Sequence, residues 1–207
     1  MLGHLIPDRS WFKPILKLVT VCVGIVFLVL ALVNLKAGEK TETVNREGVD
    51  IVFAVDVSKS MLAEDIAPNR LEKSKQLVTQ IVNNLVSDRV GIIAYAGKAF
   101  PQLPITTDYA SAKMFLQNMN TDMLSSQGTA ISEAIQLSKT YYDNEDQTNR
   151  VLVIISDGED HDGEAMSVAE EAAEQGIKIL TVGVGDVKGG PIPIKRNGVV
   201  LSYKKDN

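Results

Sequence analysis

Apolar residues between positions 50 and 184 gather in short runs that are bounded by turn residues. The apolarity of these runs is continuous rather than alternating, which is typical of strands that are covered on both faces. We therefore predict four buried strands, at Ile51–Val55, Val90–Tyr95, Val151–Ile155 and Ile177–Val184.

Between the predicted strands, apolar residues recur at the three- and four-residue spacing of amphipathic helices. The clearest pattern runs over 71–85, and weaker ones run over 131–138 and 165–172. Asp108 is a candidate N-cap for a further helix that ends near Asn118. Strands that alternate with helices predict an α/β fold, a doubly wound and mostly parallel sheet with helices on both faces.

Two segments depart from this alternation. Phe100–Thr106 contains two prolines and no helix precedes it, so we predict an edge strand or a loop, where missing N–H donors are tolerated. Near the end of the chain, Asn197-Gly198 lies between Ile192–Lys195 and Val199–Tyr203. An Asn-Gly pair between two such segments predicts a β-hairpin.

A longer apolar run, Leu18–Leu35, contains no charged residue and is bounded by Lys17 and Lys36. About 20 apolar residues span the hydrocarbon core of a bilayer as a helix, so we expect a transmembrane helix at 18–35. A cleaved signal peptide and a buried core helix are the two alternatives. Lysine and arginine lie on both sides of the run, so the charge distribution does not fix its orientation in the membrane.

These patterns divide the chain into a pre-membrane segment at 1–17, a transmembrane helix at 18–35, a polar tether at 36–48 and an α/β domain at 49–207. The formal net charge of −5 and the lack of a basic stripe argue against nucleic acid as a partner. The single cysteine, Cys22, excludes an intrachain disulfide. With only His4 and His161 beside it, a zinc site of cysteine and histidine ligands is excluded as well.

Oxygen-bearing side chains follow two of the predicted strands at the point where each strand ends. Asp56, Ser58 and Ser60 come at alternating positions after the first strand, and Asp157 follows the run that ends at 155. Thr129 precedes the helix predicted at 131. Ligands of open α/β sheets bind outside the carboxyl ends of strands, and neighbouring strands are about 4.8 Å apart. We therefore expect these five side chains to share one hard cation, which suits Mg²⁺, Mn²⁺ or Ca²⁺.

The composition of this predicted site suggests adhesion rather than turnover. Two carboxylates and three neutral hydroxyls leave Mg²⁺ electrophilic, with a coordination position open to an outside oxygen. We expect that oxygen to come from an aspartate or glutamate of a protein partner. Taken singly, a serine-rich loop is more often a helix cap and Asp157-Gly158 is more often a turn. The prediction depends on all the pieces lying at the same end of the sheet.

This set of residues resembles the metal-ion-dependent adhesion site (MIDAS) of the von Willebrand factor A domain. That site has Asp-x-Ser-x-Ser after the first strand, a threonine in a mid-domain loop and an aspartate after the fourth strand. The matching residues are Asp56, Ser58, Ser60, Thr129 and Asp157. The resemblance implies the von Willebrand factor A fold. It also implies that the serines and the threonine bind Mg²⁺ directly or nearly so, and that the aspartates often act through water.

A closer resemblance is to the aerotolerance (Bat) membrane proteins. It is carried by the segments 7–14, 56–65, 68–72, 102–112 and 127–130. The resemblance implies a bacterial inner-membrane protein whose A domain lies in the periplasm and works with sibling Bat proteins and a MoxR-type AAA+ ATPase. Members of this family have a membrane segment upstream and continue beyond the position of Asn207 into a helix, a strand and another membrane span. We therefore expect this chain to be a fragment that lacks the last strand of the sheet.

From these patterns we predict a membrane-tethered protein-binding module that depends on a divalent cation and is not an enzyme. A Mg²⁺-dependent hydrolase or phosphatase that uses the same metal is the alternative. The sequence contains no Gly-x-x-x-x-Gly-Lys phosphate loop, and Ser58 stands where aspartyl phosphotransfer commonly places a second acid. A purely structural membrane subunit is the third hypothesis.

Overall fold

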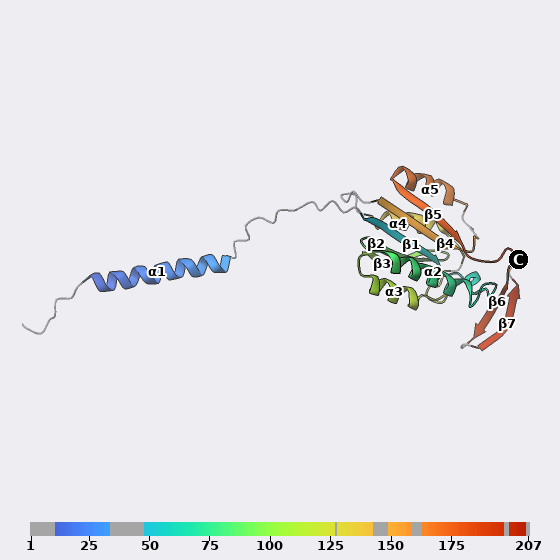
Figure 1. Ribbon diagram of the computed structural model, residues 1–207, viewed down its shortest axis with the longest axis horizontal. Coiled ribbons are helices and arrows are strands. Elements are labelled where there is room, and N and C mark those ends of the chain that lie inside the picture. The colour runs from blue at the N-terminus through green and yellow to red at the C-terminus, as the bar shows by residue number, and fades with distance from the viewer. Residues whose placement is uncertain are drawn as a thin grey trace, which may run out of the picture. The chain divides into compact units, whose positions relative to one another are not determined.

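The computed structural model describes residues 11–33, 48–126, 128–142, 149–158, 163–196 and 199–205. The chain divides into two units, Met1–Val44 and Asn45–Asn207, which we describe separately (Figure 1). The predicted tether, apart from Gly48, and the predicted hairpin turn at Asn197-Gly198 lie outside the described residues.

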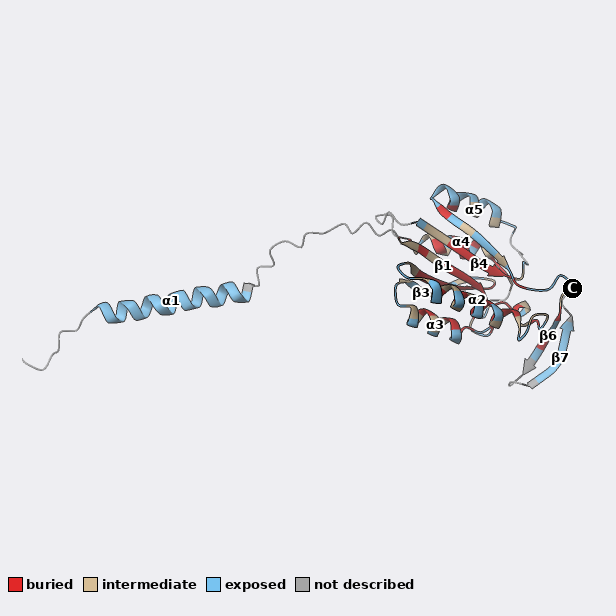
Figure 2. Ribbon diagram, viewed as in Figure 1, coloured by how far each residue is buried: buried red, intermediate tan, exposed pale blue. Residues whose placement is uncertain are grey.

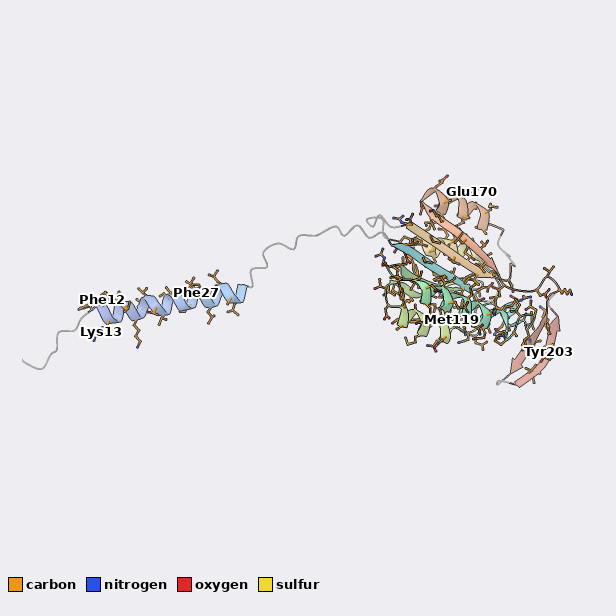
Figure 3. All side chains as sticks on the ribbon, viewed as in Figure 1. Phe12, Lys13, Phe27, Met119, Glu170 and Tyr203 are labelled. Atoms are coloured by element: carbon orange, nitrogen blue, oxygen red, sulfur yellow. The ribbon has the colours of Figure 1, made fainter. Side chains whose placement is uncertain are left out.

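The described part of the first unit is one helix, α1, Phe12–Val33. Its window Phe12–Leu32 has a mean hydropathy of 2.8, and no part of this window is buried. Figure 2 shows α1 exposed throughout, and Figure 3 shows apolar side chains such as Phe12 and Phe27 projecting from it. A helix of this length and apolarity fits a membrane span or a signal sequence. It begins earlier than the predicted span at 18–35, whose last two residues lie outside the described residues.

The second unit is built on a five-stranded sheet in the order β3-β2-β1-β4-β5. Strands β1, β2, β4 and β5 are parallel, and β3 pairs antiparallel with β2 at one edge. Their bounds are Val49–Asp56 for β1, Arg89–Tyr95 for β2, Ala99–Thr106 for β3, Asn149–Ser156 for β4 and Ile177–Gly183 for β5. The doubly wound sheet predicted from the sequence is confirmed, and the proline-containing segment at 100–106 is an edge strand.

Helices cover both faces of this sheet, as Figure 1 shows. The 3₁₀ helix η1 (Lys59–Leu62) leads into α2 (Arg70–Asn84), which with α3 (Tyr109–Asn118) packs on the side chains of Phe53 and Val55. On the other face, α4 (Ile131–Lys139) and α5 (Ala165–Glu174) pack on Val52 and Ala54. Successive side chains of a strand point to opposite faces, so β1 must be apolar at every position between the two cores. Each helix predicted from periodicity is confirmed.

A two-stranded antiparallel sheet completes the described chain. Its strands are β6, Pro191–Arg196, and β7, Val199–Lys205. The predicted hairpin is therefore confirmed, and Tyr203 stands on its second strand in Figure 3. The amide of Glu64 donates to the carbonyl of Pro191 at 3.2 Å, which connects the hairpin to the loop before α2.

The connections of the sheet create one position where the strand order reverses. The chain leaves β1 through α2 to β2 on one side, whereas β4 pairs with the other side of β1. The crevice at such a reversal, outside the carboxyl ends of the strands, is where open α/β sheets bind their ligands. Asp56 ends β1 and Asp157 follows β4, so both carboxylates come from the strands that border this crevice.

The first testable prediction concerns the start of α2, which Asn69 caps by accepting a hydrogen bond from the amide of Glu72 at 2.8 Å. We expect Asn69→Ala to lower the free energy of unfolding by about 1 kcal/mol, because an amide at the helix start loses its acceptor. Asn69→Ser retains an acceptor and should cost much less. Urea unfolding followed by circular dichroism measures both, and equal losses would contradict the capping role.

Candidate metal centre

The position of Asp56 follows from the register between β1 and β4. Parallel pairing aligns Val55 with Ile155, so that the next residues, Asp56 and Ser156, lie side by side where the strands end. Ser156 Oγ donates to Asp56 Oδ2 at 3.0 Å, and the amide of Ser58 donates to Asp56 Oδ1 at 2.8 Å. Asp56 is fully buried. Both of its carboxylate oxygens are therefore held in a fixed orientation at the crevice.

The two serines of the motif lie around the start of η1. The Oγ atoms of Ser58 and Ser60 are 2.9 Å apart, and Ser58 is buried. The amide of Val57 donates to the carbonyl of Tyr95 at 2.8 Å, which holds the chain to β2 before it turns. The turn that follows brings two hydroxyls to one point beside the carboxylate that ends β1.

Thr129 reaches the same end of the sheet through the backbone of its neighbour. The amide of Ala130 donates to the carbonyl of Ala96 at 2.8 Å, and Ala96 directly follows β2, the strand beside β1. Gly128 has a φ of 113°, a conformation that glycine adopts readily, and the turn leaves Thr129 buried. Thr129 is thus placed at the crevice by a backbone contact.

Asp157 lies just beyond β4 and uses its two oxygens differently. Its Oδ2 accepts a hydrogen bond from Arg70 Nη1 at 3.0 Å, whereas its Oδ1 is buried and has no hydrogen-bond partner among the residues that the structure describes. The next residue, Gly158, has a φ of 96° and donates its amide to Ser156 Oγ at 3.1 Å. A buried carboxylate oxygen without a partner loses its hydration uncompensated. A cation at this position would supply the missing interaction.

The charges of the two carboxylates also favour a bound cation. Burial raises the pKa of Asp56 to about 6, against the lowering effect of its hydrogen bonds with Ser58 and Ser156. The charge of Asp157 raises this pKa further, which means that the two carboxylates are close enough to repel each other. A divalent cation bound by both would replace this repulsion with attraction.

The structure thus brings the five predicted residues to one end of the sheet by different means. Hydrogen bonds join Asp56 to Ser58 and Ser58 to Ser60, and Asp157 interacts with Asp56 through its charge. In the part of the chain that the structure describes, no three His, Cys, Asp or Glu side chains gather as a metal site. The donors at the crevice are two carboxylates and three hydroxyls, and oxygen donors of this kind suit a hard cation.

Two further residues belong to this centre and were not predicted. Ser156 holds Asp56, and Arg70 holds Asp157. A signal for Ser156 exists in the sequence, because the residue before Asp157 must lie opposite Asp56 once the two strands are paired in this register. The sequence pattern contains no comparable signal for Arg70, which begins a helix that is far from Asp157 along the chain.

Comparison with known proteins places this arrangement in a family. Residues 50–191 match the von Willebrand factor type A domain. The structure of BatB from Bacteroides thetaiotaomicron is 46% identical with a TM-score of 0.72, and the match covers 77% of this chain and 76% of that one. An aerotolerance-related membrane protein from Bacteroides fragilis is 41% identical with a TM-score of 0.72, over 77% of this chain and 81% of that one.

A more distant structure shares the fold alone. Proximal thread matrix protein 1 from the mussel byssus has a zinc-occupied MIDAS. It is 19% identical with a TM-score of 0.59, over 68% of this chain and 37% of that one. Von Willebrand factor A domains commonly bind a divalent metal at a MIDAS and mediate protein–protein interactions.

The chain spans about half the length of the curated relatives it matches. Those relatives and the Bacteroides proteins are uncharacterised or aerotolerance-related membrane proteins, and no enzymatic activity is indicated for them. The match over 50–191 and the identity to the two Bacteroides structures together decide the assignment. This chain belongs to the von Willebrand factor type A domain family, among the aerotolerance-related membrane proteins.

Proposed function

We propose that this chain is a membrane-anchored module that binds a divalent cation at a MIDAS and uses the cation to bind a protein partner. The ligands are Asp56, Ser58, Ser60, Thr129 and Asp157. The observation that carries the proposal is Asp157 Oδ1, a buried carboxylate oxygen without a hydrogen-bond partner in the described part of the chain. The Asp157 carboxylate also lies close enough to buried Asp56 to raise the pKa of Asp56.

The donor set explains both the choice of cation and the mode of binding. Two carboxylates balance the charge of a divalent cation, and neutral hydroxyls complete the protein's share of its oxygen ligands. Oxygen donors favour Mg²⁺, Mn²⁺ or Ca²⁺ over metals that prefer sulfur or nitrogen, and we propose Mg²⁺ as the resident ion. When bound, the cation supplies an electrophilic position for an oxygen from outside, which we assign to a partner's carboxylate.

The setting of the module follows from α1 and from the related proteins. We propose that α1 anchors the α/β domain, residues 49–207, to the bacterial inner membrane through the tether at 36–48, with the domain in the periplasm. The similarity to BatB and to an aerotolerance-related membrane protein supports sibling Bat proteins and a MoxR-type ATPase as the partner complex. The role of this chain would then be in oxygen tolerance or another envelope stress response.

Cation binding is the direct test of this proposal. We expect Mg²⁺ to stabilise the wild-type chain and so to raise its melting temperature. When free Mg²⁺ is in hundredfold excess over its dissociation constant, the free energy of unfolding should rise by about 2.7 kcal/mol. Asp56→Ala and Asp157→Ala should abolish Mg²⁺ binding in isothermal titration calorimetry. Glu170→Ala is the matched control, because it removes an exposed carboxylate on α5 that is not a proposed ligand. Wild-type affinity in Asp56→Ala would refute the site.

The raised pKa of Asp56 gives a prediction without metal. Its shift from 3.8 to about 6 means that folding favours the protonated form. The associated stability is complete below the unfolded-state pKa and is lost as the pH rises through about 6, on the order of 3 kcal/mol in all. Asp56→Asn retains an acceptor for Ser58 and has no charge, so in chelator it should exceed the wild type in stability at neutral pH.

This pH dependence is measured as a difference between the two proteins, so that other carboxylates cancel. Denaturant unfolding in chelator should show the advantage of Asp56→Asn growing between about pH 4 and about pH 7 and then levelling off. Saturating Mg²⁺ should reverse the order of stability, because the cation binds the ionised carboxylate. An advantage that does not change with pH would contradict the origin we give for it.

Partner binding is tested in membranes with the full chain. Crosslinking followed by affinity capture should recover a partner in Mg²⁺, lose it in chelator and recover it again when Mg²⁺ returns. The Asp157→Ala variant should capture nothing in either condition, whereas Glu170→Ala should behave as the wild type. Capture that ignores the chelator would favour the purely structural subunit. Metal-dependent hydrolysis of p-nitrophenyl phosphate that is lost in Asp157→Ala would instead establish the hydrolase alternative.

A further inference from the structure

Arg70 is the most heavily engaged side chain near the candidate metal centre. Its guanidinium donates from Nε and Nη2 to the carboxylate of Asp65, over distances of 2.9 to 3.1 Å, and from Nη1 to Asp157 Oδ2 at 3.0 Å. The side chain of Arg70 is only 5% exposed, and those of Asp65 and Asp157 are 2% exposed. One buried cation thus connects two buried carboxylates, of which only Asp157 is a proposed metal ligand.

Asp65 is itself held by two backbone amides. Its Oδ2 accepts the amide of Asp186 at 2.6 Å, and its Oδ1 accepts the amide of Ile66 at 3.1 Å. Although burial acts in the opposite direction, the hydrogen bonds and charge of Arg70 and the amide of Asp186 lower the pKa of Asp65. Asp65 therefore remains a charged and immobile anchor for the guanidinium.

The backbone after β5 passes close to both Arg70 and Asp65. A Cβ at Gly185, whose φ is 155°, would lie 3.1 Å from Arg70 Nε. A Cβ at Gly190 would lie 2.6 Å from the Cβ and 2.8 Å from the amide nitrogen of Asp65. The approach at Gly190 is too close for any side chain, so glycine is required there. At Gly185 the positive φ and the short distance to Arg70 both disfavour a side chain.

We propose that Arg70 and Asp65 are positioning residues, which hold Asp157 by Oδ2 so that Oδ1 alone faces the cation. The inference rests on the proposed metal site. A guanidinium is planar and presents five donors in a fixed fork, so it can hold two carboxylates at once in a defined orientation. A lysine carries the same charge on a single nitrogen and cannot reproduce this geometry.

The charge balance of the cluster supports the same assignment. Asp56, Asp65 and Asp157 when ionised carry three negative charges and Arg70 carries one positive charge, so the net charge of these four groups, −2, matches in magnitude that of a divalent cation. Arg70 also prevents Asp157 from offering both of its oxygens to the same ion. Mg²⁺ requires a near-ideal octahedral arrangement, whereas Ca²⁺ accepts bidentate carboxylates and irregular geometry. A clamped, one-oxygen Asp157 therefore favours Mg²⁺ over Ca²⁺.

The test compares Mg²⁺ and Ca²⁺ affinities of folded variants by isothermal titration calorimetry of the full chain. We expect Arg70→Lys, which conserves the charge, to weaken Mg²⁺ binding by about 10- to 100-fold, the usual effect of losing a group that orients a metal ligand. The loss in Ca²⁺ affinity should be smaller, so the preference for Mg²⁺ falls. Asp65→Asn leaves the Arg70 guanidinium in place but weakens the carboxylate that holds it. This variant should also lose more Mg²⁺ affinity than Ca²⁺ affinity, and both losses should be smaller than in Arg70→Lys.

Arg89 provides a matched control at the opposite end of the sheet. It forms an ion pair with Asp50, with Nε–Oδ1 and Nη2–Oδ2 distances of 2.6 Å, across the start of β1 and β2. Arg89→Lys removes a comparable fork without touching the crevice. It should lower stability and leave both cation affinities unchanged, because a purely structural role does not alter the Mg²⁺ to Ca²⁺ ratio.

The outcomes separate this inference from the function on which it rests. If the wild-type chain binds neither cation, the proposed metal site fails and the inference fails with it. The inference alone is overturned if the wild type binds Mg²⁺ and folded Arg70→Lys binds each cation as tightly as the wild type does. It is also overturned if Arg70→Lys loses Mg²⁺ and Ca²⁺ affinity by the same factor. Should Arg70→Lys not fold, Asp65→Asn decides by the same ratio.

Discussion

Parallel pairing of β1 with β4 determines where the two carboxylates of the candidate metal centre lie. The register that aligns Val55 with Ile155 sets Asp56 beside Ser156 and carries Asp157 one residue further, over the crevice. Both strands are held in place by apolar cores on the two faces of the sheet. A slip of one residue would turn the side chains of a strand to the opposite faces and separate Asp56 from Ser156. The packing that fixes the register of the two strands therefore also fixes the positions of the two carboxylates.

That constraint places two like charges where water is scarce. Burial and the neighbouring Asp157 both disfavour the ionised form of Asp56, so the domain bears an electrostatic cost at neutral pH when no cation is present. The large cores on either side, which include Phe53, Leu116 and Ile135, make this cost tolerable. A binding site of this kind is a local destabilisation that the rest of the fold supports and that a ligand removes.

Most of the fold was predictable from the sequence, because strands buried on both faces and amphipathic helices leave strong local patterns. The gathering of the proposed ligands at one end of the sheet was predictable as a group, since Asp56, Ser58, Ser60 and Asp157 lie at or just beyond strand ends and carry hard oxygens. Arg70 was not predictable by such reasoning. Its partners Asp65 and Asp157 are brought together by the turn before α2 and by the exit of β4, and the close approach depends on glycines at 185 and 190. Long-range ion pairs of this kind have no periodicity to reveal them.

The two ends of the sheet show what distinguishes a structural ion pair from a binding site. At the amino end of β1, Asp50 meets Arg89 through two parallel hydrogen bonds across the start of β1 and β2. At the carboxyl end, Arg70 serves both Asp65 and Asp157, while Asp56 takes its hydrogen bonds from a neutral hydroxyl and a neutral amide. The two ends thus use the same residue types in different arrangements. The net charge of −2 on Asp56, Asp65, Asp157 and Arg70 is the feature of the carboxyl end on which the proposed divalent cation site rests.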